Sequence, residues 1–192
     1  MEKLSSGKFE LVLLLHRKIH SRHGNCKTLK GNQIIVLTPQ VDEGILQIAE
    51  STIEEMPELV AYVDGGCLGN PGPSGIGVVI QGTADGPVRI AKWIGHQDNN
   101  VAEYAALMEA LQYAVSLKAR KLHVYSDSEV VVRQMTGAYI CRSARLYSLH
   151  WTCRKLARSL AFSISHVRRE DNAEANGLAQ AVLRSREISA NQ

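Results

Sequence analysis

The sequence has little of what would place it among disulfide-rich, zinc-bound, secreted or membrane proteins. Its 192 residues include four cysteines, and none of them are in C-x-x-C spacing. Free thiols in a reducing cytoplasm are therefore expected, rather than a zinc ribbon or a disulfide framework. The longest apolar run near the N-terminus, residues 11–15, is far shorter than the roughly 20 residues that cross a bilayer. No secretory signal pattern is present, so we expect no membrane partner.

Charge of one sign is not in large excess, since 22 basic residues face 19 acidic ones and the net charge is +3. The charges are unevenly placed along the chain. Residues 16–30 are basic and contain no acid, whereas residues 31–58 are acidic and contain no lysine or arginine. A basic cluster can bind nucleic acid or can simply face solvent, and charge alone does not separate the two.

Hydrophobic patterning divides the chain at about residue 58. Residues 1–58 form an N-terminal extension of unknown role, in which we expect a strand at 33–37 and a helix at 41–56. Residues 59–186 show sharp patterns of an α/β domain with a mixed sheet, and 187–192 form a tail. A run rich in glycine and proline at 65–77 is expected to be a turn. The expected order is strands at 59–64, 75–82 and 88–95, a helix at 99–117, a strand at 121–127, helices at 126–135 and 146–160, a strand at 162–167 and a helix at 174–186.

Three acidic residues stand against apolar surroundings in the part of the chain with sharp patterns. Asp64 ends the first expected strand, Asp127 ends the fourth, and Glu103 lies early in the first helix. Each of them alone could be a turn residue, a helix cap or a favourable charge at a helix start. Together at strand ends they would repel one another unless a hard divalent cation such as Mg²⁺ or Mn²⁺ joined them.

Four sequence blocks in order carry a family resemblance over about residues 59–185. They read YVDGGCLGNPGPSGIGVVI, NNVAEYAALMEAL, LHVYSDSEVVVRQMTG and SHVRREDNAEANGLAQAV. This series resembles ribonuclease H type 1, which cuts the RNA strand of RNA/DNA hybrids with two Mg²⁺ or Mn²⁺ ions. The resemblance implies a five-stranded mixed sheet, its first three strands antiparallel, flanked by helices. It also implies that Asp64 bridges the two ions. Glu103 and Asp127 would then complete the ligands of the ion nearer the leaving group.

The resemblance places Asn176 where the family has its fourth catalytic and metal-binding aspartate. An amide keeps the shape of a carboxylate but has no charge, and its NH₂ group repels a cation. We therefore expect hydrolysis to be reduced or absent while binding of the hybrid persists. An alternative is an inactive module that binds hybrid or a protein partner, and a third is a fragment of a retroelement polyprotein. Glu170 and Asp171, just upstream, are considered as substitutes for the missing acid.

The resemblance also implies contacts to nucleic acid and assigns other side chains to structural roles. The run at 65–70 lacks a P-loop pattern, and the resemblance makes it a backbone contact to RNA 2′-hydroxyls. His166 is expected to be structural, and Tyr147 and Trp151 to be core residues rather than platforms for bases. Arg168 and Arg169 face either phosphates or solvent. A monomer is expected, and the residues expected to contact nucleic acid are Gly65, Gly66, Cys67, Gly69, Asn70, Asn100, Ser128, Gln134 and Arg142.

Overall fold

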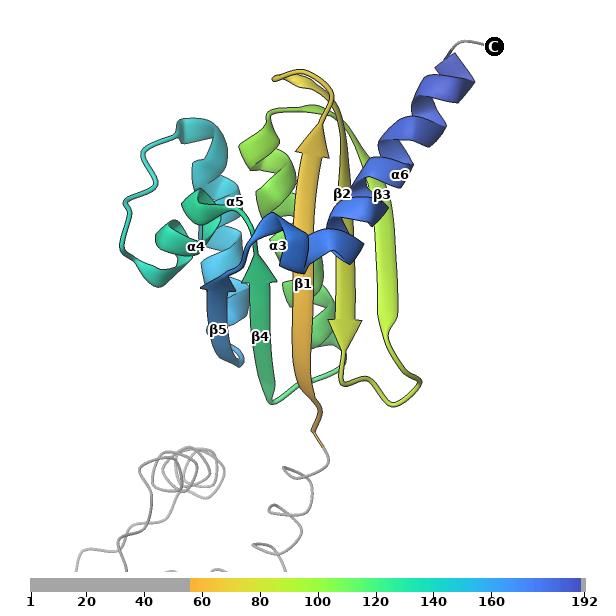
Figure 1. Ribbon diagram of the computed structural model, residues 1–192. Helices are drawn as coiled ribbons and strands as arrows, with labels where there is room; N and C mark the ends of the chain where they lie inside the picture. Colours follow the sequence, from red (N-terminus) through yellow and green to blue (C-terminus); the bar gives the residue numbers. More distant parts are fainter. Residues whose placement is uncertain (1–55, 191–192) are drawn as a thin grey trace, which may run out of the picture. The chain divides into compact units, whose positions relative to one another are not determined.

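Alternating apolar residues build a five-stranded sheet whose central strand is the first one in the described chain. The computed structural model describes residues 56–190, with helices on both faces of the sheet (Figure 1). The strands are β1 (Glu58–Cys67), β2 (Gly72–Gln81), β3 (Val88–Gln97), β4 (Lys121–Ser126) and β5 (Ala161–His166). The helices are α3 (Asn99–Ser116), α4 (Glu129–Thr136), α5 (Ala144–Ala157), the 3₁₀ turn η1 (Arg169–Asn172) and α6 (Ala173–Ala190).

The strand order is β3-β2-β1-β4-β5, which confirms the expected mixed sheet. Strands β1, β2 and β3 pair antiparallel, whereas β4 runs parallel to β1 and β5 parallel to β4. Parallel neighbours bring their carboxyl ends to the same edge of a sheet. Asp64 near the end of β1 and Asp127 just after β4 are therefore placed at one edge by the topology.

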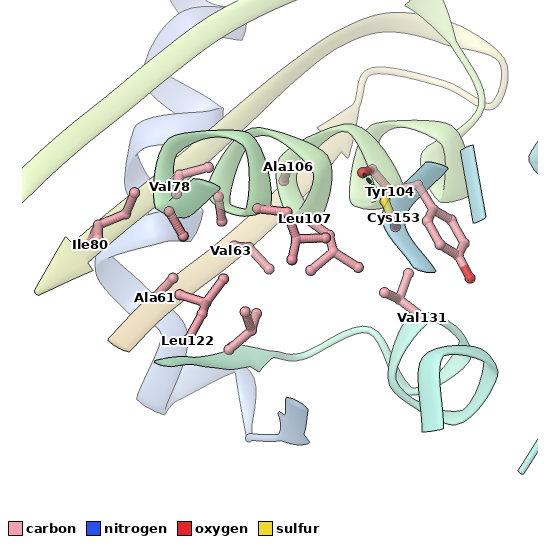
Figure 2. Packing of buried hydrophobic residues seen from close by; sticks show 14 of the residues in the cluster. Ala61, Val63, Val78, Ile80, Tyr104, Ala106, Leu107, Leu122, Val131 and Cys153 are labelled. Carbon is pink, nitrogen blue, oxygen red and sulfur yellow. Dashed lines mark hydrogen bonds between the residues drawn. The ribbon is translucent and has the colours of Figure 1, made fainter. Parts of the chain in front are cut away.

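The main core lies between the sheet and the layer that contains α3 and α5. Alternate residues of β1 and β2, among them Val63 and Val78, point toward Leu107 of α3, and all three side chains are fully buried (Figure 2). Burial of one such side chain contributes about 1.5–3 kcal/mol. This layer fixes the position of α3, which carries Glu103 into the site.

The prediction of a turn over the glycine-rich run at 65–77 is wrong, because most of these residues belong to paired strands. Strand β1 continues to Cys67 and β2 begins at Gly72, so the turn itself is only residues 68–71. The glycines allow two helices to approach the sheet closely. A Cβ atom on Gly65 would lie 2.1 Å from the carbonyl carbon of Ala102 in α3, and one on Gly77 would lie 2.0 Å from the carbonyl oxygen of Ala175 in α6.

Helix α5 turns a different face to the core from the one expected. Leu146 and Cys153 are buried, while Tyr147 is 60% exposed and Trp151 is 56% exposed. The expectation that Tyr147 and Trp151 are core residues is therefore wrong. Apolar residues occur on both sides of this helix, so periodicity does not determine which side packs against α3.

The expected strand at 33–37 and the basic stretch at 16–30 lie outside the described residues, as does the expected helix at 41–56 apart from Met56. Within residues 56–190, no helix is both long and apolar enough to cross a membrane. Cys67, Cys141 and Cys153 are free thiols, as expected.

Candidate active site

Three carboxylates from three different elements meet at the edge of the sheet where β1 and β4 end. One carboxylate oxygen from each of Asp64, Glu103 and Asp127 can be chosen so that all three lie within 4.8 Å of one another. Asp64 and Glu103 are buried, and Asp127 is partly buried. Carboxylate oxygens at this spacing are donors that hard divalent cations prefer.

The close approach of α3 to β1 determines where Glu103 lies. Gly65 has no side chain, so the backbone of Ala102 and Glu103 can pack directly against the strand. The backbone N–H of Gly65 then donates to Oε2 of Glu103 at 3.2 Å. One glycine thus brings the second carboxylate beside Asp64 and supplies a donor that holds it there.

Burial and mutual repulsion make two of these carboxylates hard to ionise. Burial raises the pKa of Asp64 to about 6, and the negative charge of Asp127 adds to the rise. Burial raises the pKa of Glu103 well above its usual value, with further increases from Asp64 and Asp127 and an opposing effect of the Gly65 N–H. A cation between them would remove both costs, so the electrostatics of the site favour a bound ion.

Two asparagines hold the third carboxylate from the other side. Nδ2 of Asn172 donates to Oδ1 of Asp127 at 3.0 Å and to the backbone oxygen of Val63 at 2.9 Å. Nδ2 of Asn176 donates to Oδ2 of Asp127 at 3.4 Å and to the backbone oxygen of Asn172 at 3.0 Å. Asn176 therefore turns its nitrogen, and not its oxygen, toward the carboxylates. Sequence reasoning missed Asn172, whose only signal is its place one helical turn before Asn176.

The Oδ1 atoms of these two asparagines have no hydrogen-bond partner among the described residues, although both are buried. Buried polar atoms are nearly always paired, so two exceptions side by side need an explanation. Amide oxygens are acceptable ligands for hard cations. Two unused amide oxygens therefore lie next to the site, on side chains whose nitrogens face Asp127.

The two acids considered as substitutes for a fourth aspartate do not join the cluster. Glu170 lies 3.8 Å from the Arg168 guanidinium, and Asp171 lines a separate hollow with Tyr62 and Gln81. Arg169 is the residue of this loop that faces the site, because its Nη1 lies 3.8 Å from Oδ2 of Asp127. Its positive charge partly offsets the repulsion at Asp64 and Glu103.

A cleft of about 450 Å³ opens beside the carboxylates. Asp64, Glu103 and the end of β1 contribute to its lining, and α6 contributes Gln180, Leu183 and Arg184. Sequence reasoning missed these three residues of α6, since their place in the cleft depends on how the helix packs against the sheet. The residues that line the cleft are Asp64, Gly65, Gly66, Cys67, Leu68, Asn99, Glu103, Arg169, Ala179, Gln180, Leu183 and Arg184.

The structure brings some of the expected nucleic-acid contacts to this cleft and leaves others elsewhere. Gly65, Gly66 and Cys67 line the cleft, and Asn70 accepts a hydrogen bond from the backbone N–H of Asn99 at 3.1 Å. Asn99 lines the cleft, whereas Asn100 is exposed and is not among the lining residues.

Four further predicted contacts lie away from the cleft lining. Gly69 adopts a positive φ of 82° in the turn after β1. Ser128 precedes α4, where its N–H donates to Ser126 Oγ at 3.1 Å. Gln134 is buried and accepts a hydrogen bond from the Tyr104 hydroxyl at 2.7 Å, so it faces the interior. Arg142 is exposed between α4 and α5.

His166, which is expected to be structural, contacts the backbone oxygen of Asp127 at 3.2 Å, in agreement with that role.

The sheet order and the carboxylates at its edge define an RNase H-like protein. The model of the reverse transcriptase-like family matches residues 62–182, and the chain belongs to this RNase H-like family. A ribonuclease HI of Halobacterium salinarum is 35% identical over 64% of this chain. A bifunctional protein of Mycobacterium tuberculosis is 37% identical over 66% of it. The chain spans 63% of the length of the first of these relatives and 35% of the second.

Solved structures show the same fold. The crystal structure of RNase H1 from H. salinarum is 35% identical and superposes with a TM-score of 0.63, covering 67% of this chain and 98% of that one. The structure of LC11-RNase H1 in complex with an RNA/DNA hybrid is 32% identical, with a TM-score of 0.61, and covers 67% of this chain and 98% of that one.

Proposed function

We propose that the chain is a metal-dependent endonuclease that binds RNA/DNA hybrids and cuts their RNA strand, with a hydrolytic step weakened by Asn176. The observation that carries this proposal is the meeting of Asp64, Glu103 and Asp127 at one edge of an RNase H-like sheet. The relatives named ribonuclease HI and the LC11 complex with a hybrid support the choice of substrate.

The residues of the site fit Mg²⁺ or Mn²⁺. Asp64, Glu103 and Asp127 would hold the ions, and Asn176 stands at the fourth position of the family pattern with its amide nitrogen toward Asp127. Bound ions would lower the pKa of an attacking water and stabilise the leaving oxygen of a phosphodiester. The family binds two ions. In this chain Asn176 replaces a charged ligand of one of them, so that ion would be held less tightly.

The chain's own groups position the substrate and limit the reaction. Backbone at Gly65–Cys67 and the side chain of Asn99 line the cleft, where they can contact an RNA strand and its 2′-hydroxyls. Arg169 and Arg184 supply positive charge for phosphates. Asn176 supplies no negative charge, and its NH₂ group occupies an oxygen of Asp127 that would otherwise be open to an ion.

The same hydrogen bond favours a second candidate function, a module that binds hybrid without cutting it. In that case the Asn176 amide stabilises Asp127 in place of a metal ion. The two functions share the cleft and differ in whether the RNA strand is hydrolysed.

A paired binding and cleavage assay on the full chain separates the candidates. We expect the chain to shift an RNA/DNA hybrid in a gel but not double-stranded DNA of the same sequence, and to cut the RNA strand slowly with Mg²⁺ or Mn²⁺. Binding without any cutting would leave the module as the function. If the chain neither binds nor cuts hybrid, both candidates are wrong.

We also infer that the chain is a monomer. We infer separately that it acts in the cytoplasm, a compartment that keeps thiols such as those of Cys67, Cys141 and Cys153 reduced. Light scattering behind a sizing column tests the first statement, and a dimer mass would contradict it.

A further inference from the structure

The outward face of α5 carries exposed aromatic rings that the candidate active site does not use. Tyr147, Trp151 and Lys155 follow one another at four-residue spacing, which places them about 6 Å apart along one side of the helix. Nζ of Lys155 lies 5.4 Å from the centre of the Trp151 ring. Exposed apolar side chains that lie next to one another on one face can mark an interaction site.

A hollow with two arginines adjoins these rings. It measures about 210 Å³ and is lined by residues of α4, α5 and β5, among them Met135, Arg154, Arg158 and Phe162. Within residues 56–190, neither arginine forms an ion pair with a carboxylate. Unpaired guanidinium groups are well suited to phosphate oxygens.

The charge of this side of the molecule indicates a polyanion as its partner. The sequence from residue 130 to residue 169 contains no aspartate or glutamate. Arg133, Arg145, Arg168 and Arg169 of this segment pair with carboxylates elsewhere, whereas Arg142, Arg154, Lys155 and Arg158 form no ion pair with the described residues. Stacking rings next to a basic groove are the features that bind unpaired bases and their phosphates. A duplex hides the faces of its bases, so the rings favour a single strand.

Helix α5 starts close to the catalytic cleft and leads away from it. Nη1 of Arg145, in its first turn, lies 2.7 Å from Oδ2 of Asp98, the residue before α3. The next residue, Asn99, lines the cleft. Figure 1 shows α5 running beside α3 on the same side of the sheet. A strand that leaves the cleft past Asp98 would therefore meet α5.

We propose that the α5 ridge, defined as Tyr147, Trp151, Arg154, Lys155 and Arg158, binds a single-stranded extension of a nucleic acid whose duplex part occupies the cleft. The rings stack on unpaired bases, and the arginines and the lysine bind their phosphates. The inference depends on the proposed function only for the duplex part, since the ridge itself is separate from the carboxylates.

The test compares blunt and tailed RNA/DNA hybrids by fluorescence anisotropy, with the full chain in buffer that contains EDTA. The single-stranded tail is placed in turn at each of the four ends of the hybrid. We expect one tailed hybrid to bind about tenfold more tightly than the blunt one, as stacking of an unpaired base on a ring would produce. Tyr147→Ala/Trp151→Ala should abolish this preference without changing the affinity for the blunt hybrid.

Charge variants separate phosphate contacts from general attraction. Arg154→Gln/Arg158→Gln should lower the salt slope for the tailed hybrid by about 1.4, the value for two phosphates of a single strand. Arg89→Gln/Lys92→Gln removes two charges from β3, the strand at the opposite edge of the sheet from β5, and should leave the tail preference intact. Since all these side chains are exposed, thermal melting should show native stability for each variant.

Stacking has its own spectroscopic signature. The chain has two tryptophans, so Trp93→Phe leaves Trp151 as the reporter. A single-stranded oligonucleotide should quench its fluorescence. Equal affinity for the blunt hybrid and all four tailed ones, or a tail preference that survives the double alanine variant, would overturn the proposal. Absent binding of the blunt hybrid, with quenching retained, would instead count against the proposed function alone.

Discussion

The two halves of the candidate active site compensate their charge in different ways. In the acidic half, Asp64 of β1 and Glu103 of α3 are buried beside each other, and one backbone N–H is the donor that faces them. In the amide half, Asp127 accepts hydrogen bonds from Asn172 and Asn176 and lies near Arg169. The acidic half therefore needs a cation from outside, whereas in the amide half the chain itself supplies donors to the carboxylate of Asp127.

Each half depends on one glycine that lets a helix pack closely against the sheet. Gly65→Ala should push α3 and Glu103 away from β1, and Gly77→Ala should push α6 and Asn176 away from β2, because each new Cβ would meet backbone. Each substitution should cost about 3 kcal/mol in the free energy of unfolding. Gly66→Ala is the matched control, since its Cβ would meet only Leu183 at 3.8 Å. Urea unfolding measures all three, and equal costs for Gly65 and Gly66 would contradict this packing.

Protonation should reveal the uncompensated charge of the acidic half. Burial raises the pKa of Asp64 from 3.8 to about 6, so the folded protein binds more protons than the unfolded chain between these values. Metal-free protein should therefore lose stability as the pH rises through this interval, by about 3 kcal/mol from Asp64.

The variant Asp64→Asn tests this sign directly. In metal-free buffer it should be more stable than the native chain at neutral pH and should lose much of the dependence on pH. Saturating Mg²⁺ should stabilise the native chain at neutral pH but stabilise the variant less. A variant that is destabilised equally at all pH values would show that the ionised form of Asp64 does not destabilise the fold.

The amide half should respond to loss of hydrogen bonds rather than to pH. Asn172→Ala removes the donor shared by Val63 and Asp127 and should cost about 2 kcal/mol in the free energy of unfolding. Asn100→Ala, at an exposed position, is the control and should cost little. Thermal unfolding of both variants gives the comparison, and similar melting temperatures would mean that Asn172 does not hold the two strand ends together.

The smallest effect is expected at Arg169, which links the two halves. Its side chain is 67% exposed and 3.8 Å from Asp127, so Arg169→Gln should change stability by less than about 0.5 kcal/mol. It should nevertheless move the pH transition of the metal-free protein upward, because Arg169 lowers the pKa of both Asp64 and Glu103. Stability curves against pH for the variant and the native chain would show this shift, and an unchanged transition would contradict it.

Local patterning predicted the order of strands and helices along the chain and the three acids at strand and helix ends, since these depend on alternation and spacing, and the resemblance to ribonuclease H predicted the five-stranded mixed sheet. It failed at 65–77, where glycine serves close packing between a strand and a helix rather than a turn. It also failed on α5, because both of its faces carry apolar residues. Asn172 and the residues of α6 in the cleft could not be predicted, since their roles depend on how α6 crosses the sheet.

The most direct test of the account is the rate of hybrid cleavage in Asn176→Asp relative to the native chain, with Mg²⁺ and with Mn²⁺. A carboxylate in place of the amide should restore a full set of negative ligands and raise the rate by about 100-fold or more. Asp64→Asn in the same background should abolish cleavage, which excludes a contaminating nuclease. A native chain that already cuts as fast as Asn176→Asp would contradict the central claim.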